Sequence, residues 1–230
     1  MRKPAILILG LLISFYSFSQ EKIDIGLNFN FAYPTSDFGF DDSEDPLYLP
    51  PGMAFGGSLE GNYWFAQNFS AGIEVGYLMF SDEITEINGI DITTNATAIP
   101  IMAKATVYLG RGIVKPYLEL GAGYCLYTQK QSVTEVIIDP VVFETSWDQS
   151  GAIISPRLGL KIDFTDQISM KINVQYNQMI NKIDGDHSVD ISIDGESSTE
   201  TAPGMYANNV GYLGVNAGIT FTLFDYFGRF

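Results

Sequence analysis

The sequence predicts an all-β fold, an eight-stranded antiparallel up-and-down transmembrane β-barrel with four long external loops. Three observations lead to this prediction. Apolar and polar residues alternate with period two in eight segments, which is typical of strands with one apolar face. Short and long connections between these segments alternate strictly along the chain. Finally, one face of the eight segments contains no Asp, Glu, Lys or Arg, whereas the other face is polar and charged.

The eight segments occur in chain order and each has a clearly apolar face. They cover residues 24–33, 55–65, 69–77, 99–109, 117–126, 154–164, 168–177 and 212–223. We expect these apolar faces to contact lipid. Their main residues are, strand by strand, Ile25, Leu27 and Phe29; Leu59 and Tyr63; Ile73 and Val75; Ile101 and Val107; Leu118 and Leu120; Leu158 and Leu160; Ile172 and Val174; and Val215 and Ile219.

The opposite faces carry eight charged residues: Glu60, Glu74, Lys104, Glu119, Arg157, Lys161, Asp163 and Lys171. A single Arg or Lys on the lipid side at mid-bilayer costs about 2–4 kcal/mol, so we expect this face to be enclosed. Four acidic and four basic side chains can pair there as a lumen charge network that forms a structural core. Glycines on the same faces would make room for these long side chains: Gly26, Gly56, Gly72, Gly76, Gly121, Gly123, Gly159, Gly214 and Gly218.

Two alternatives to a filled transmembrane barrel stay open. The charged interior could form a narrow gated conduit. Polarity alone also does not decide which surface of a sheet is concave, so a soluble lipocalin-like binder would have the same pattern with its faces inverted.

The connections favour the membrane barrel. Three short turns lie at 66–68, 110–115 and 165–167, and four long connections at roughly 34–52, 80–98, 128–150 and 179–208. The long connections hold nineteen acidic residues against Lys130 and Lys182. Tight turns on one side and long loops on the other are typical of outer-membrane barrels.

The N-terminus, residues 1–19, has the features of a secretory signal peptide. Arg2 and Lys3 precede an apolar run from Ala5 to Ile13, and small residues follow. This run is shorter than the about 20 residues that a membrane helix needs. We expect cleavage between Ser19 and Gln20, which leaves residues 20–230 for the barrel.

The composition excludes several other classes. The 230 residues are 46% apolar and only 17% charged, and they include 23 Gly and 13% aromatic residues, a mixture common in strand-rich proteins. The single Cys125 and the single His187 exclude disulfide frameworks, CxxC clusters and multi-histidine metal sites. A net charge of −15 argues against nucleic acid as a partner. We expect no cofactor.

The stretches GNYWFAQNFSAGIEVGY, KPYLELGAGY and PRLGLKIDF resemble the small outer-membrane β-barrel families. These include the OmpA-type and OmpX-type transmembrane domains and the porin-family barrels of Bacteroidetes. The resemblance is one of pattern and spans the mature chain. It implies a place in the cell outer membrane of a Gram-negative bacterium, with outer-membrane lipid and lipopolysaccharide around the barrel. Divalent cations would bridge the lipopolysaccharide phosphates to the acidic loops. The terminal Phe230 resembles the signal that the barrel assembly machinery recognises, although the strand pattern stops near Leu223.

The last long connection contains two imperfect motifs for chemistry. His187 lies between Asp186 and Ser188, which invites comparison with omptin-like or lipid-A-deacylase-like sites, but adjacent residues of an extended loop point to opposite sides. Asp184, Asp186, Ser188 and Asp190 match alternate positions of a calcium loop, yet Val189 and Gly195 occupy the positions that need Gly and Glu. We therefore expect no catalytic residue and no metal site.

The expected function is that of a non-enzymatic integral outer-membrane barrel with a structural or surface-interaction role. The alternatives are a narrow diffusion channel, a lipid-A-modifying enzyme and the soluble binder.

Overall fold

The computed structural model describes residues 22–35, 51–87, 90–110, 112–135, 141–180, 187–193, 196–202 and 211–224. The expected signal peptide lies outside these residues, as do Asp184, Asp186, Gly195 and Phe230. Among the described residues, no helix is long and apolar enough to cross a membrane.

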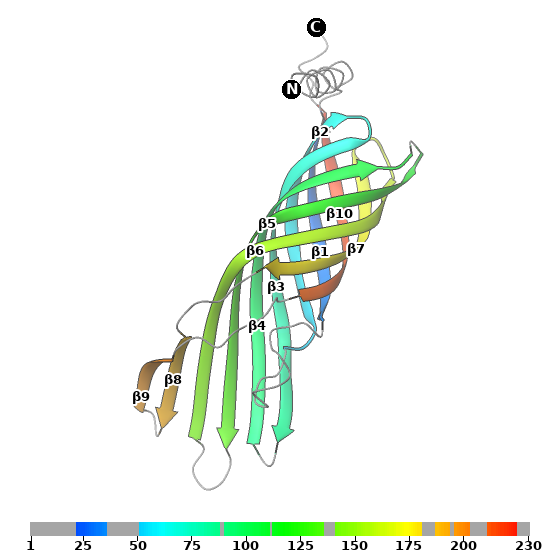
Figure 1. Cartoon of the computed structure of the whole chain (residues 1–230). Helices are drawn as coiled ribbons and strands as arrows, with labels where there is room; N and C mark the ends of the chain where they lie inside the picture. Colours follow the sequence, from blue (N-terminus) through cyan, green and yellow to red (C-terminus); the bar gives the residue numbers. More distant parts are fainter. Residues whose placement is uncertain are drawn as a thin grey trace, which may run out of the picture.

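The described residues form ten strands (Figure 1). They are β1 (Lys22–Pro34), β2 (Ala54–Ala66), β3 (Phe69–Ile87), β4 (Ile90–Tyr108), β5 (Val114–Glu135), β6 (Val141–Asp163), β7 (Ile168–Ile180), β8 (His187–Ile193), β9 (Glu196–Ala202) and β10 (Gly211–Phe224).

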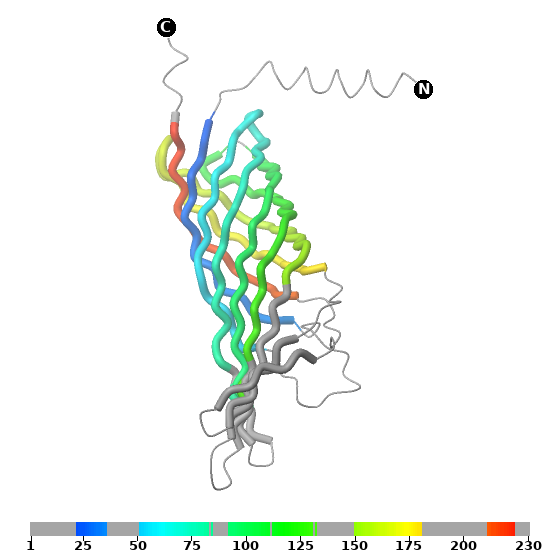
Figure 2. Tube along the Cα trace, turned by 90° about the vertical axis from the view of Figure 1, so that its left-hand side faces the viewer, coloured from blue at the N-terminus to red at the C-terminus, as the bar shows by residue number. Residues whose placement is uncertain are grey.

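Eight of these strands close into a barrel. β1 to β6 each pair with the next strand in antiparallel register, and β10 pairs with both β7 and β1 to complete the ring. Closure gives each barrel strand a hydrogen-bonded neighbour on both sides, which a membrane requires because hydrocarbon offers no partner to backbone groups. Figure 2 shows the strands running obliquely along the barrel wall, as closure of a sheet demands. The predicted eight-stranded antiparallel barrel is confirmed.

One end of the barrel, here called the turn end, carries the three short connections. Gly110 adopts a φ of 104° between β4 and β5, a left-handed conformation that suits glycine. Between β6 and β7, the Thr165 hydroxyl accepts hydrogen bonds from the backbone N–H groups of Gln167 and Ile168. β1 begins and β10 ends at the turn end, since Lys22 pairs with both Trp64 and Phe224.

At the opposite end, the loop end, several strands continue beyond the barrel (Figure 1). β3 and β4 stay paired to Ile87 and Ile90, and β5 and β6 stay paired to Glu135 and Val141. β8 pairs with this extension of β6, and β9 pairs with β8. The sequence analysis predicted long loops at 80–98 and 128–150, whereas most of these two stretches is paired strand in the structure. The predicted strands were therefore too short at this end. The Thr, Ile and Val residues of the two stretches have high strand propensity, even though they lack the simple alternation of the barrel wall.

The two faces of the barrel wall differ in exposure: the apolar face points outward and the charged face points inward, as the charge pattern predicts. The twelve residues Ile25, Leu27, Phe29, Ile73, Val75, Ile101, Leu120, Leu158, Ile172, Val174, Val215 and Ile219 lie on the outer surface, with exposed fractions from 38% to 67%. Their inward neighbours are buried, as in the strict alternation of β1. This arrangement is the reverse of a lipocalin-like barrel, in which the apolar face points inward.

Candidate functional site

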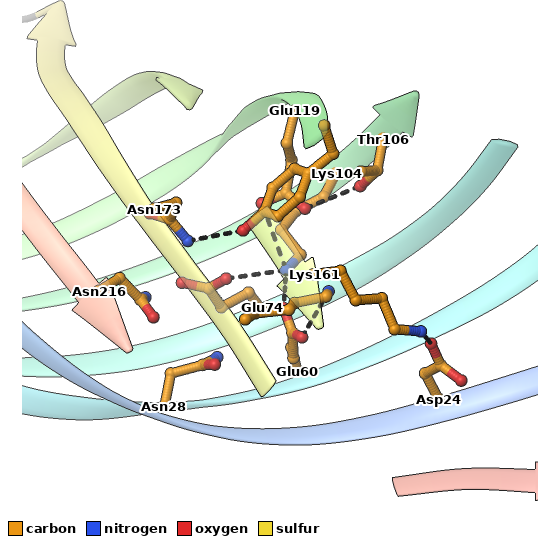
Figure 3. A network of polar contacts seen from close by, with 12 residues as sticks. Asp24, Asn28, Glu60, Glu74, Lys104, Thr106, Glu119, Lys161, Asn173 and Asn216 are labelled. Carbon is orange, nitrogen blue, oxygen red and sulfur yellow. Dashed lines mark hydrogen bonds and ion pairs between the residues drawn. The ribbon is translucent and has the colours of Figure 1, made fainter. Parts of the chain in front are cut away.

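The barrel interior contains three layers of side chains along its length. The turn-end aromatic layer consists of Trp64, Tyr108 and Tyr117. The loop-end apolar layer is formed mainly by Leu78, Phe80, Tyr127, Ile153, Met179 and Tyr212. Between them lies the ionic layer, which consists of Glu60, Glu74, Lys104, Glu119, Arg157 and Lys171. Figure 3 labels Glu60, Glu74, Lys104 and Glu119 of this layer. Each of these six residues is at most 5% exposed.

Glu60 on β2 joins two cations from other strands. Its carboxylate accepts a hydrogen bond from Lys104 on β4 and another, of 2.7 Å, from Lys171 on β7. β2 and β7 are not neighbours in the ring, so the second contact crosses the interior. Lys104 also reaches Glu74 at 3.0 Å and Glu119 at 3.5 Å. The Glu60 carboxylate and the Lys104 ammonium group thereby connect side chains of β2, β3, β4, β5 and β7.

Arg157 on β6 completes the ionic layer. Its guanidinium donates to both carboxylate oxygens of Glu74, at 2.6 and 3.1 Å, and to Glu119 at 3.1 Å. Its Nε donates to Ser155 Oγ at 3.0 Å, and Thr106 donates to Glu119 at 2.7 Å. Such forked contacts are stronger than neutral hydrogen bonds and fix the geometry of the pair. Three glutamates thus face two lysines and one arginine, so the layer is electrically balanced.

A second ion pair lies next to the aromatic layer. The Asp24 carboxylate accepts hydrogen bonds from Lys161 Nζ at 2.9 Å, Trp64 Nε1 at 2.8 Å and Thr222 Oγ1 at 2.7 Å. The Lys161 ammonium group also lies 4.7 Å from the centre of the Trp64 ring, within cation–π range. Asp24 was absent from the charged residues expected in the network. The alternation of the first strand, which puts Asp24 on the same face as Gly26, is the signal that could have found it.

Asp163 differs from the other seven residues of the expected network. Its side chain is 26% exposed at the turn-end opening, where it pairs with Lys115 at 2.6 Å. Lys161 is farther away, at 3.8 Å. The pair of Asp163 and Lys115 is therefore a partly solvated surface contact and not a member of the enclosed layer.

Residues 5–194 match the model of the family described as the outer membrane protein beta-barrel domain. The chain belongs to this family. The expected resemblance to small outer-membrane barrels is confirmed, and so is the expected location in the cell outer membrane.

Two solved structures show the same fold at low sequence identity. The outer membrane protein OprG from Pseudomonas aeruginosa is 12% identical, with a TM-score of 0.57 over 90% of this chain and 98% of that one. A major outer membrane protein from Thermus thermophilus is 9% identical, with a TM-score of 0.57 over 87% and 99%. The outer membrane protease OmpT from Escherichia coli also matches, at 10% identity and a TM-score of 0.48 over 90% and 98%. Among curated protein sequences there is no significant match.

The glycines of this outer-membrane barrel have more than one role. Gly26 lies opposite Glu60 and leaves room for its carboxylate, as expected. Gly159 and Gly218 make room for the uncharged side chains of Tyr117 and Asn28. Others on the same faces allow close approach of backbones: a Cβ on Gly56, Gly72 or Gly123 would meet the carbonyl oxygen of Tyr77, Gly61 or Ile101, respectively. The expectation that the glycines accommodate charges therefore applies to only part of the set.

Replacing Gly26 with alanine is expected to lower the free energy of unfolding of the outer-membrane barrel by about 1–3 kcal/mol. The new Cβ would lie 2.6 Å from Glu60 Oε1 and 2.7 Å from its Cγ, and both lysine contacts hold this side chain in place. The matched control is Gly61→Ala on the same sheet, where a Cβ meets nothing within 4 Å. Urea unfolding in detergent micelles measures both, and equal midpoints for the two variants would contradict the prediction.

The two imperfect motifs of the last long connection lie only partly within the described residues. His187, Ser188, Val189 and Asp190 belong to β8, whereas Asp186 lies outside the described residues. In the described part of the chain, no group of three or more His, Cys, Asp or Glu residues could hold a metal ion. Cys125 is buried within the loop-end apolar layer.

Proposed function

We propose that this outer-membrane barrel is a non-enzymatic, non-conducting protein with a structural or surface-interaction role. The observation that supports this proposal is the filled interior. Three layers of buried side chains lie in succession along the barrel, and the central one is a balanced set of six paired charges. An eight-stranded barrel has an interior just wide enough for side chains to fill it.

The two outer layers add to the argument against conduction. At the turn end, the rings of Trp64 and Tyr108 stack with their centres 4.4 Å apart. At the loop end, Phe80 packs edge-on against Tyr127 and Tyr212, at 6.2 and 6.0 Å. An ion crossing the barrel would have to displace aromatic side chains at both ends and separate the ion pairs between them.

An enzymatic role has little chemical support in the described residues. A hydrolase needs an activated nucleophile next to a base, or a metal-bound water. The buried carboxylates of the interior are instead held in ion pairs with lysines and arginine, which removes the freedom to act as bases on a substrate.

Conductance across planar lipid bilayers tests the proposal. Protein that is refolded in detergent, with folding verified by heat-modifiable gel mobility, is expected to give no steady conductance. A large and steady native conductance would support the diffusion channel instead. A parallel assay of lipid A modification, with a His187→Ala variant as control, tests the enzymatic alternative: activity that disappears in the variant would contradict the proposal.

The same role implies the partners of the barrel. The apolar outer surface would contact outer-membrane lipid, and the barrel assembly machinery would insert the chain. Lipopolysaccharide would bind near the acidic connections through divalent cations, because its phosphates and these carboxylates repel each other directly. Binding of the refolded protein to lipopolysaccharide vesicles should then decrease when EDTA is added, and binding that is indifferent to EDTA would contradict the bridging.

A further inference from the structure

The outer surface changes from apolar to polar where β4 and β5 continue beyond the barrel (Figure 1). The apolar band of these two strands ends at Ile99 and at its register partner Leu126. The next outward residues form the outer polar face, which is defined here as Thr93, Asn95, Thr97, Thr128, Lys130 and Ser132. The register between β4 and β5 runs through this face without a shift, so each of its β4 residues lies opposite one of its β5 residues.

The residues between those of the outer polar face point to the other side of the sheet. Ile92 and Thr94 are fully buried, and Gln129 is 1% exposed. The six residues of the outer polar face are all partly or fully exposed, with Lys130 the most exposed of them. Because successive residues of a strand alternate between two faces, the face that meets lipid in the barrel wall continues directly into the outer polar face.

The outer polar face extends farther from the membrane core than phospholipid headgroups do. From Ile99 to Thr93 the strand advances about 20 Å, at roughly 3.4 Å per residue. With a strand tilt of about 40°, this corresponds to about 15 Å along the membrane normal. Phospholipid headgroups occupy only about 5–8 Å on each side of the hydrocarbon core. They would leave much of the outer polar face uncovered, whereas a lipid that carries several sugars would border all of it.

The side chains of the outer polar face suit sugars. Five of the six carry a hydroxyl or an amide group, which can donate and accept hydrogen bonds as sugar hydroxyls do. The sixth is Lys130, the only Lys or Arg that the described residues place at the loop end, because the others lie in the interior or at the turn end. A protein interface typically has a core enriched in aromatic side chains, and the outer polar face has no aromatic residue.

We propose that the outer polar face binds the saccharide part of a phosphorylated glycolipid of the lipopolysaccharide class, and that Lys130 contacts one of its phosphates. This inference rests on the proposed place of lipopolysaccharide around the barrel, and it names the surface that this lipid meets. The apolar band below Ile99 and Leu126 would hold the acyl chains. One lipid molecule would thus lie along β4 and β5 from the hydrocarbon to the sugars.

The neighbouring strand is acidic at the same level. The register places Asp148 of β6 opposite Thr128, and Glu144 opposite Ser132. Carboxylates repel phosphates unless a cation bridges them, whereas a lysine ammonium group binds a phosphate directly. Part of the lipopolysaccharide binding should therefore persist when divalent cations are removed, and this part should depend on Lys130.

The Lys130→Gln variant tests this dependence in the refolded chain, with folding verified by heat-modifiable gel mobility. In EDTA, its affinity for purified lipopolysaccharide in detergent should be about two- to five-fold weaker than that of the unmodified protein. The matched control is Gln67→Glu, which changes the net charge by the same amount at an exposed position of the turn end and should bind normally. An unchanged affinity of Lys130→Gln, or an equal loss in both variants, would overturn the proposal. An equal loss of affinity for phosphatidylglycerol would also overturn it, because this lipid offers a phosphate without the saccharide. If the unmodified protein does not bind lipopolysaccharide at all, the proposed partner itself is wrong.

Photo-crosslinking in intact Gram-negative cells gives a second test that does not depend on affinity. A Ser132→p-benzoylphenylalanine variant has its reactive group at the far end of the outer polar face. It is expected to form an adduct with lipopolysaccharide that an antibody against this lipid detects. The same substitution at Gln67, at the turn end, is expected to give no such adduct. If Ser132 yields adducts only with proteins, or no adduct, the outer polar face does not bind the glycolipid.

Discussion

Replacing Glu60 with glutamine is expected to lower the free energy of unfolding by about 3–5 kcal/mol, the range for breaking a buried ion pair from one side. The carboxylate neutralises Lys104 and Lys171 at once, and both ammonium groups are buried. Glutamine keeps the size of the side chain but leaves an uncompensated positive charge in the ionic layer. Urea or guanidinium unfolding in detergent micelles, followed by tryptophan fluorescence, measures the loss.

Two further variants separate charge from packing. Adding Lys171→Met to Glu60→Gln restores the charge balance and should recover part of the loss, because a buried pair can often be replaced by apolar residues. Asp163→Asn, which breaks the partly exposed pair with Lys115, should cost less than about 1 kcal/mol. If Glu60→Gln and Asp163→Asn had equal effects, the ionic layer would not be the electrostatic core of the barrel.

Replacing Ile73 with arginine is expected to lower stability in lipid bilayers by about 2–4 kcal/mol. Ile73 lies near the middle of the barrel wall on the outer surface of β3, and the residue is 67% exposed. An arginine there would place its charge in hydrocarbon, far from either interface. Reversible unfolding from phosphatidylcholine vesicles measures the difference.

The control for the position of the residue along the membrane normal is Ile113→Arg. Ile113 is equally exposed, at 70%, but lies in the short turn between β4 and β5. Near an interface the cost falls to about 0–1 kcal/mol. A penalty that is the same at Ile73 and Ile113 would contradict the proposal that the middle of the outer surface faces lipid.

Sequence alone predicts the barrel where the two faces differ in polarity. In β1, every second residue from Ile25 to Tyr33 is apolar and the residues between them are small or polar, so the inward face is unambiguous. The run from Tyr77 to Phe80 is different, because it is apolar on both faces. Polarity therefore gave no sign of which residues of this run turn inward, and the loop-end apolar layer could not be foreseen from it.

The partners within the ionic layer also could not be derived from the sequence. Alternation assigns Glu60, Glu74 and Lys171 to the enclosed side, but it does not say how far each strand is shifted relative to its neighbours. That shift decides whether Lys171 meets Glu60 across the barrel or a carboxylate nearer in sequence. The paired strands beyond the barrel were missed for a related reason: residues such as Thr93, Thr94 and Asn95 are polar on both faces.

The bond between Glu60 and Lys171 has a consequence for how the molecule assembles. The two residues are separated by 111 positions in the chain and belong to strands that meet only across the finished cylinder. In a β-sheet that has not yet closed into a barrel, Lys171 would lack its counter-ion Glu60, and its ammonium group would have to stay in contact with solvent. Desolvation of these charged groups and pairing of β1 with β10 should therefore occur in one cooperative step. Such a step disfavours long-lived folding intermediates.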